Sequence, residues 1–122
     1  EWGVLHNHYH LMAQSPENAL TLPGIVRDIH KFTAMWIKSH VPGCSALERI
    51  WCNYWDRCIR DESGYLTRIN YIWYNPEKHG LTDDARNWRF GSFYKRIRED
   101  EQYVRNFLAR YPFSRVREVD FF

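Results

Sequence analysis

The sequence predicts a single domain of the α+β class over residues 1–122. A stretch near the N-terminus alternates residue types with the period of a strand, and later stretches repeat apolar residues with the period of a helix. A chain of 122 residues is enough for one domain with its own core. Hydrophobic residues make up 44% of the chain, which excludes a disordered protein, and the lack of a long apolar run predicts no membrane span.

Charge and cysteine content narrow the class of protein. The net charge of +2 is too small to indicate nucleic-acid binding by itself, so that prediction depends on where the basic residues lie. Cys44, Cys52 and Cys58 are odd in number and form no CxxC pair, which fits a reducing compartment. We therefore expect a cytoplasmic, soluble protein.

The first half of the chain predicts a strand, a helix and a second strand. The strand covers residues 2–13, and a polar, proline-containing connection over residues 14–24 follows it. A helix then begins at Ile25 and ends at Val41-Pro42-Gly43. Its apolar stripe, expected in the core, consists of Ile25, Ile29, Phe32 and Trp36. Residues 49–60 are rich in aromatic and β-branched types and predict the second strand.

The second half predicts two more helices. Asp61 or Ser63 can cap a helix that runs to about Asn75, where Pro76 and then Gly80 end it. Its apolar side carries Leu66, Ile69, Ile72 and Trp73, and another stripe, facing away from the core, carries Thr67, Tyr71 and Asn75. The last helix runs roughly from Asp100 to Tyr111, with Val104, Phe107 and Leu108 inside.

Three histidines alternate along the first predicted strand. Side chains two residues apart on a strand share one face at about 7 Å spacing, so His6, His8 and His10 would point the same way. Imidazole is the commonest side-chain metal ligand, and the pair His8 and His10 would leave an octahedral cation positions for an amide oxygen, water and a phosphate oxygen. The alternative is a strand whose histidines only satisfy local hydrogen bonds.

A tyrosine and an asparagine lie one helical turn apart on the second predicted helix. A phenol is a weak nucleophile near neutral pH, but beside a polarised phosphate Tyr71 could attack phosphorus and hold a covalent intermediate. Asn75 could complete a metal shell or orient the phosphate. The alternative is an ordinary surface tyrosine, and Tyr74 and Tyr65 compete for the role of nucleophile.

Four sequence blocks together resemble one enzyme family. Residues 5–12 (LHNHYHLM) resemble the histidine-hydrophobic-histidine (HUH) strand of the single-tyrosine transposases that act on single-stranded DNA. Residues 54–62 (YWDRCIRDE), 71–81 (YIWYNPEKHGL) and 87–93 (NWRFGSF) resemble, in order, three further blocks of the branch called REP-associated tyrosine transposases. The resemblance spans residues 4 to about 95, and four blocks in order are far more specific than one.

The resemblance implies a fold and a reaction. It implies a ferredoxin-like antiparallel sheet with helices on one face and the histidine strand central. His8 and His10 become metal ligands, Asn75 assists the metal or the phosphate, and Tyr71 becomes the nucleophile. The implied reaction cleaves and rejoins single-stranded or hairpin DNA through a 5′-phosphotyrosine, with Mg²⁺ or Mn²⁺ and no nucleotide cofactor. A monomer or a homodimer is expected, with no membrane partner.

Two features depart from the family pattern. His6 stands where the family usually has proline, which leaves it as a spare ligand, a phosphate contact or an exposed residue. The family's opening strand and helix, which precede the histidine strand, have no counterpart here. Because a sheet without them would expose an edge, we expect either an inactive copy or one that needs a partner.

Basic and aromatic residues suggest where DNA would bind. Residues 87–98 interleave the two types, as single-strand binders require, although the aromatic residues could instead belong to the core. Including positions on the predicted helices, the candidate DNA contacts are Arg27, Lys31, Arg68, Trp88, Arg89, Lys95 and Arg96.

Two rival functions remain open from the sequence. The spacing His6-x-His8-x-His10 also fits histidine-triad nucleotide hydrolases, although their motif closes the domain and prefers an apolar residue where Asn7 stands. The chain could also be a remnant that binds hairpin DNA without cutting it.

Overall fold

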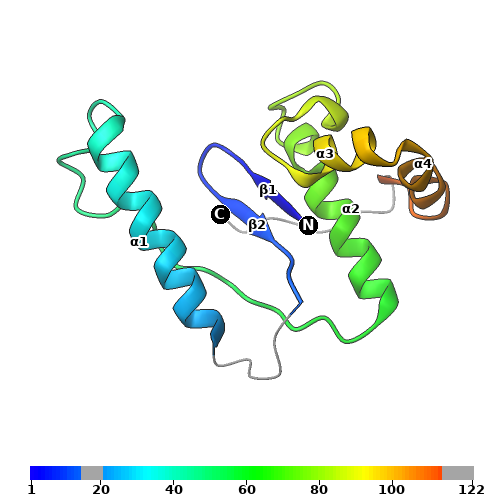
Figure 1. Cartoon of the computed structure of the whole chain (residues 1–122), viewed down its shortest axis with the longest axis horizontal. Helices are drawn as coiled ribbons and strands as arrows, with labels where there is room; N and C mark the ends of the chain where they lie inside the picture. The colour runs from blue at the N-terminus through cyan, green and yellow to red at the C-terminus, as the bar shows by residue number, and fades with distance from the viewer. Residues whose placement is uncertain (15–20, 114–122) are drawn as a thin grey trace. The chain divides into compact units, whose positions relative to one another are not determined.

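The computed structural model describes residues 1–14 and 21–113, which fall into two compact units. The first unit contains residues 1–13 together with the described residues from Cys58 onward, and the second contains the described residues between Gln14 and Arg57. The described residues form a two-stranded antiparallel sheet and helices, so the predicted α+β class is confirmed (Figure 1). None of the described helices combines the length and hydrophobicity that crossing a membrane requires.

A short β-hairpin opens the first unit, where the sequence predicts one continuous strand. Strand β1 (Trp2–Val4) pairs antiparallel with β2 (Tyr9–Leu11), with Gly3 opposite His10. The Leu5 amide donates to the His8 carbonyl at 2.8 Å, so the chain reverses at His6 and Asn7. The single strand over residues 2–13 is therefore wrong. Asn7, a residue favoured in turns, interrupts an alternation that otherwise fits a strand.

Helix α2 (Glu62–Lys78) is the central element of the first unit. The Asp61 side chain caps the helix by accepting from the Gly64 amide at 2.7 Å. Asp61 is one of the two residues predicted as the cap. The predicted end near Asn75 is too early, because Pro76 lies inside the helix. The helix ends at Lys78, and Gly80 follows with φ of +66°.

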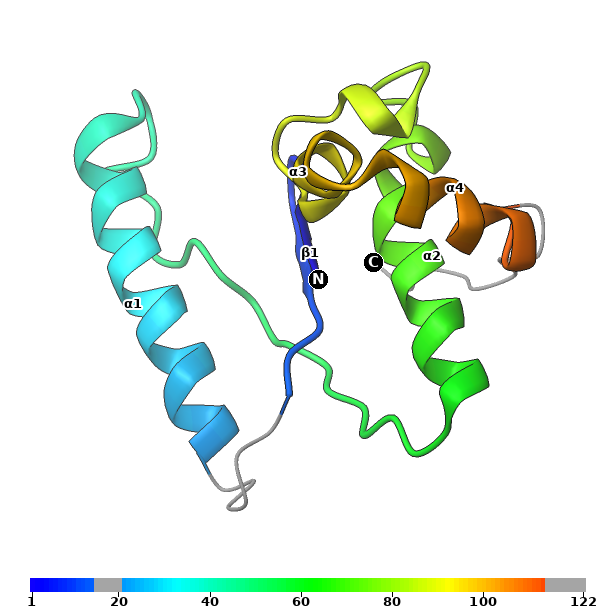
Figure 2. The same cartoon turned by 45° about the vertical axis from the view of Figure 1, so that its right-hand side comes forward.

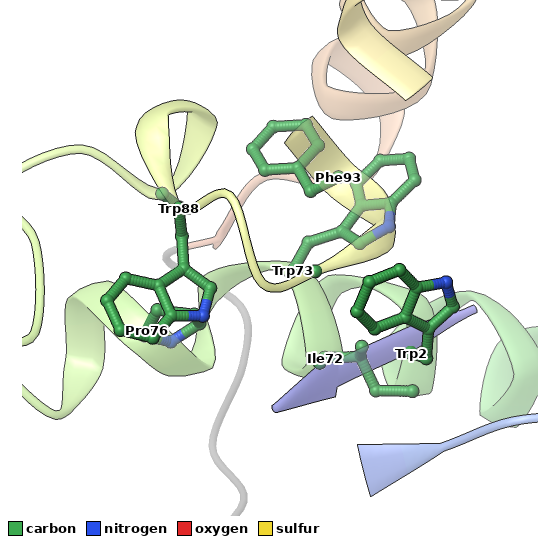
Figure 3. Close-up of a pocket in the computed structure, with 9 residues that line it drawn as sticks. Trp2, Ile72, Trp73, Pro76, Trp88 and Phe93 are labelled. Carbon is green, nitrogen blue, oxygen red and sulfur yellow. The ribbon is translucent and has the colours of Figure 1, made fainter. Parts of the chain in front are cut away.

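The core of the first unit forms where α2 meets the C-terminal helices. The 3₁₀ helix η2 (Ala85–Asn87), α3 (Ser92–Glu99) and α4 (Glu101–Arg110) follow α2 in order. The predicted inner faces of α2 and of the last helix are confirmed, since both contribute to one buried cluster that contains Ile69, Ile72, Trp73, Ala85, Phe93, Val104 and Phe107. The Trp73 and Phe93 rings stack with centroids 4.7 Å apart (Figure 3).

Strand β1 is held against α2 on one side and against the start of α3 on the other. A Cβ at Gly3 would lie 3.5 Å from the Ile72 carbonyl oxygen, whose usual helical partner is missing because Pro76 has no N–H. On the other side, the Val4 amide donates to the Phe90 carbonyl at 2.8 Å. The Ser92 hydroxyl accepts from the Trp2 amide at 3.0 Å and donates to the Trp2 carbonyl at 3.1 Å. The hairpin lies beside α2 in both views (Figures 1 and 2).

Glu1 adds a polar anchor between the hairpin and two helices. Its carboxylate accepts from the Trp73 indole at 3.1 Å and pairs with the Arg96 guanidinium at 2.9 Å. The Glu1 side chain is only 8% exposed, whereas that of Arg96 is 51% exposed. The start of the hairpin is therefore tied to α2 and α3 at once.

The second unit consists of helix α1 (Leu22–His40) and the extended segment that follows it. The helix ends before Val41-Pro42-Gly43 as predicted, but it begins three residues earlier than Ile25. Residues 15–20 of the predicted connection lie outside the described part of the chain. The predicted strand over residues 49–60 is wrong, because the structure assigns no strand there. Aromatic composition alone does not supply a pairing partner.

The predicted core stripe of α1 is largely exposed. Ile25, Phe32 and Trp36 keep 47%, 64% and 58% of their surface, and Val26 is instead the buried residue of this helix. Trp36 stacks on His40 with ring centroids 4.6 Å apart. The helical period was predicted correctly, but the burial of the stripe was not.

Candidate active site

Helix α2 places Tyr71 and Asn75 under the hairpin. The two residues are one helical turn apart, so their side chains lie on the same face. Tyr71 is 6% exposed and Asn75 is 0% exposed. The sequence predicts a polar stripe that faces away from the core, but this part of the stripe is covered rather than at the surface.

The hairpin brings two imidazoles to this buried face. The His8 and His10 rings meet edge to face with centroids 5.0 Å apart, because both point to the same side of the hairpin. The His10 ring also meets the Tyr71 ring, with centroids 5.1 Å apart. The hairpin and helix α2 therefore bring His8, His10, Tyr71 and Asn75 into one cluster.

Burial keeps the His10 imidazole neutral. Desolvation is the main cause that lowers the pKa of His10 to about 4, and the neighbouring His8 and His79 rings lower it further, while a hydrogen bond with Asn75 acts the other way. A neutral imidazole has a nitrogen lone pair available to a cation. The Nε2 atoms of His8 and His10 and the Oδ1 atom of Asn75 are all buried, which places two nitrogen donors and one amide oxygen in a protected position.

Two residues at the end of α2 join the cluster without having been predicted. The His79 ring lies with its centroid 5.3 Å from that of His8, and the Lys78 ammonium lies 5.0 Å from the centre of the Tyr71 ring. Burial lowers the pKa of Lys78. The signal was available in the sequence, because Tyr71, Asn75 and His79 are spaced by four residues and Lys78 follows Tyr71 by two turns.

The competing tyrosines and His6 lie in other surroundings. Tyr74 stacks on Phe113 with ring centroids 5.0 Å apart, and Tyr65 is 47% exposed near the start of α2. His6 is exposed in the turn of the hairpin, where its ring lies 6.2 Å from that of Trp88. Of the three candidate tyrosines, Tyr71 is the one in ring contact with His10.

The histidines alone do not form a metal site. Among the residues that the structure describes, no three His, Cys, Asp or Glu side chains are grouped so that they could hold an ion. The donors at hand are the two imidazoles of the hairpin and the Asn75 amide oxygen. This set of nitrogen and oxygen donors suits an octahedral cation that retains water or phosphate ligands.

The predicted DNA contacts of the first unit differ in how accessible they are. Trp88 is half-buried and donates from its indole to the Val4 carbonyl at 3.0 Å, so it also supports the hairpin. Arg68 is half-buried on α2, while Arg89 is exposed. Lys95 lies 3.6 Å from Glu99 in an exposed pair, and Arg96 is bound to Glu1.

The predicted contacts of the second unit both lie on exposed positions of α1. Arg27 pairs with Asp28 at 3.1 Å, and its side chain is 74% exposed. The Lys31 ammonium lies 5.7 Å from the centre of the Phe32 ring. The two basic residues are one helical turn apart on α1.

Comparison with known proteins supports the family that the sequence blocks resemble. The chain is 28% identical over 99 residues to the REP-associated tyrosine transposase of Escherichia coli (strain K12), covering 79% of this chain and 54% of the relative. It is 27% identical over 106 residues to a Haemophilus influenzae protein assigned to the same class, covering 80% of this chain and 59% of the relative. The chain is thus similar in sequence to two proteins of the REP-associated tyrosine transposase class.

The similarity to these transposases is partial in length. The chain spans a little over half of each curated relative that it matches. No family model and no solved structure matches the chain.

Proposed function

We propose that this chain cleaves and rejoins single-stranded or hairpin DNA through a 5′-phosphotyrosine, in the manner of an HUH transposase. The ring contact between His10 and Tyr71 carries the proposal, because it brings the predicted nucleophile to the predicted metal ligands. The names of the two relatives support the same class of reaction.

Tyr71 would perform the covalent step. Its hydroxyl oxygen would form a bond to the phosphorus of the scissile phosphate, the bond from phosphorus to the 3′-oxygen would break, and the phenolic proton would leave for solvent. The released 3′-oxygen would take up a proton and become a hydroxyl. In the rejoining step a 3′-hydroxyl would attack the same phosphorus and lose its proton to solvent, the bond from phosphorus to the Tyr71 oxygen would break, and the phenolate would leave and take up a proton.

His8, His10 and Asn75 would hold the divalent cation that this family implies, Mg²⁺ or Mn²⁺. Their buried Nε2 and Oδ1 atoms are nitrogen and oxygen donors of the kinds that such an ion accepts. A cation bound there would supply Lewis-acid polarisation of the phosphate oxygen. His10 is suited to this role because burial keeps its imidazole neutral.

Lys78 would place a positive charge beside the reacting phenol. Its ammonium lies 5.0 Å from the Tyr71 ring centre, and a nearby positive charge favours the phenolate that attacks and leaves. The low exposure of Tyr71 would limit water near the phosphotyrosine and so protect the link from hydrolysis.

The remaining parts of the proposal concern fold and assembly. We propose that the hairpin belongs to a ferredoxin-like sheet with helices on one face, supported by the packing of β1 on α2. The HUH domain would extend over residues 1–122. The protein would act as a monomer or a homodimer on DNA in the cytoplasm.

The test is a search for a covalent protein–DNA adduct. The chain is incubated with labelled single-stranded hairpin DNA and Mn²⁺, and denaturing electrophoresis detects a slowly migrating species. We expect an adduct that chelator abolishes and that Tyr71→Phe eliminates. Tyr74→Phe is the matched control on the same helix and is expected to retain the adduct. An adduct that persists in Tyr71→Phe and disappears in Tyr74→Phe would reassign the nucleophile.

A second candidate function is hairpin binding without cleavage. The observation in its favour is that Tyr71 is only 6% exposed, so a scissile phosphate would reach it only after the site opens. This function predicts hairpin affinity that survives both chelator and Tyr71→Phe, with no adduct formed by the unmodified chain.

A further inference from the structure

The second unit contains a hollow that the proposed catalytic cluster does not use. Its volume is about 440 Å³, which is in the range of small-ligand sites. One wall comes from α1 and the other from the extended segment after it. The lining residues are Pro23, Val26, Arg27, His30, Cys52, Asn53, Tyr54 and Trp55.

The wall formed by α1 is braced by aromatic contacts. The His30 ring stacks on the Trp51 ring, with centroids 5.0 Å apart and planes 11° from parallel. The Trp51 indole donates to the Thr33 hydroxyl at 2.8 Å, and that hydroxyl donates to the Ile29 carbonyl at 2.6 Å. These contacts attach the extended segment at Trp51 to α1 within the second unit.

The opposite wall offers aromatic surface to the solvent. Trp55 is 83% exposed and Tyr54 is 40% exposed. Large aromatic side chains rarely stay this exposed side by side unless they meet a partner. Asn53, beside them in the lining, offers both donor and acceptor groups for the edge of a base.

The α1 wall supplies a cation, Arg27, to the lining of the same hollow. The Arg27 side chain is 74% exposed and has Asp28 as its carboxylate partner at 3.1 Å. An exposed ion pair of this kind contributes little stability, so a phosphate can compete for the guanidinium. Stacking surface, an amide and an arginine in one hollow are what a single-stranded nucleotide requires.

We propose that this hollow binds one nucleotide of single-stranded DNA, with its base stacked on Trp55 and Tyr54 and its phosphate paired with Arg27. The inference rests on the proposed function, because the bound nucleotide would belong to the strand that Tyr71 cleaves. It adds a second anchoring point for DNA, on a different unit from the catalytic cluster.

The test measures equilibrium binding without cleavage. The full chain carrying Tyr71→Phe is titrated, in chelator, into fluorescein-labelled oligothymidylate, and fluorescence anisotropy gives the affinity. Trp55→Ala is expected to weaken binding about tenfold, as loss of one stacking platform does. Trp55→Phe keeps an aromatic face and is expected to restore most of the affinity. Trp36→Ala, an exposed tryptophan on α1 outside the hollow, is the matched control and is expected to bind normally.

A second measurement tests the phosphate contact. Arg27→Gln is expected to reduce the slope of log affinity against log salt by about 0.7, the value for one phosphate contact on a single strand. Photocrosslinking with 5-iododeoxyuridine, followed by mass spectrometry, is expected to label Trp55 or Tyr54. Circular dichroism of each variant checks that the chain remains folded.

The outcomes separate this inference from the proposed function. Equal affinity of folded Trp55→Ala and the parent chain, or crosslinks confined to other segments, would overturn the nucleotide site. A change in self-association of Trp55→Ala with unchanged DNA affinity would do the same, since it would make the hollow a protein contact. Absence of an adduct in the unmodified chain contradicts the proposed cleavage but leaves this binding result intact.

Discussion

At the scale of single residues, the surroundings of Tyr71 are set by protein groups rather than by solvent. An imidazole lies against one part of its ring and an ammonium lies 5.0 Å from its centre. Strand β2 positions His10, and the last turn of α2 positions Lys78. Any chemistry at the phenol oxygen would therefore depend on these two neighbours.

Replacing Lys78 tests the electrostatic part of this arrangement. Lys78→Gln removes the positive charge beside Tyr71, and we expect adduct formation to slow about tenfold, because the phenolate loses a stabilising charge. Lys78→Arg keeps the charge and is expected to recover most of the rate. The measurement is the initial rate of adduct formation across a pH series, where Lys78→Gln should require higher pH for the same rate.

The matched control for this substitution is Arg105→Gln, which removes an exposed positive charge on α4 that pairs with Glu101. It is expected to leave the rate at saturating DNA unchanged. Equal rates for Lys78→Gln and the unmodified chain at every pH would contradict a role for the ammonium.

At the scale of elements, α1, α2 and α4 could be predicted from the sequence, whereas α3 was not predicted and the strands were predicted with wrong bounds. The apolar spacing of α2 and α4 is local, so the burial of Ile69 and Val104 could be predicted from the sequence alone, whereas the α2 cap was narrowed only to Asp61 or Ser63. A strand needs a partner from elsewhere in the chain, and that partner is not visible in local composition. This is why the predicted strand over residues 49–60 is wrong.

The candidate site was predictable for a related reason. His8 and His10 share a face whether the segment is one strand or one arm of a hairpin, because only their spacing of two matters. Tyr71 and Asn75 likewise depend only on helical spacing. What the sequence could not indicate is the packing of hairpin on helix, which depends on Gly3 and on distant groups such as Ser92.

Glu1 gives the hairpin a pH-dependent attachment to α2 and α3. Burial raises the pKa of its carboxyl, but hydrogen bonds with Ser92, Trp73 and Arg96 outweigh this, so the pKa lies below its ordinary value of 4.5. A carboxyl with a lowered pKa stabilises the folded state above its ordinary pKa, and this contribution is lost as the pH falls through the folded-state value.

We therefore expect Glu1→Gln to lower the free energy of unfolding by about 1–3 kcal/mol at neutral pH, the cost of losing charged hydrogen bonds. The difference from the unmodified chain should shrink as the pH falls below 4.5. Urea denaturation at a series of pH values measures it. Glu99→Gln, which removes an exposed partner of Lys95, is the control and should cost less than about 1 kcal/mol. A difference for Glu1→Gln that does not change with pH would contradict the ionic anchor.

At the scale of the whole molecule, the two compact units carry different proposed tasks. The first holds His8, His10, Tyr71 and Asn75, and the second holds the hollow beside Arg27. The sequence predicts one domain over residues 1–122, and this stays a prediction. The four sequence blocks do not reveal the division because the block at residues 54–62 spans the boundary between the units near Arg57 and Cys58.

If His8, His10 and Asn75 bind a divalent cation, that cation should raise the thermal stability of the whole chain. An ion that binds only the folded protein stabilises it by about 2.7 kcal/mol at a free concentration of about 100 times the dissociation constant. We expect Mn²⁺ to raise the melting temperature of the unmodified chain, with chelator reversing the shift. His10→Ala should lose this increase in melting temperature because one buried nitrogen donor is gone. His40→Ala, an exposed histidine on α1, should keep it. If His10→Ala keeps the full increment, the ion is held elsewhere, and His8, His10 and Asn75 are not its ligands.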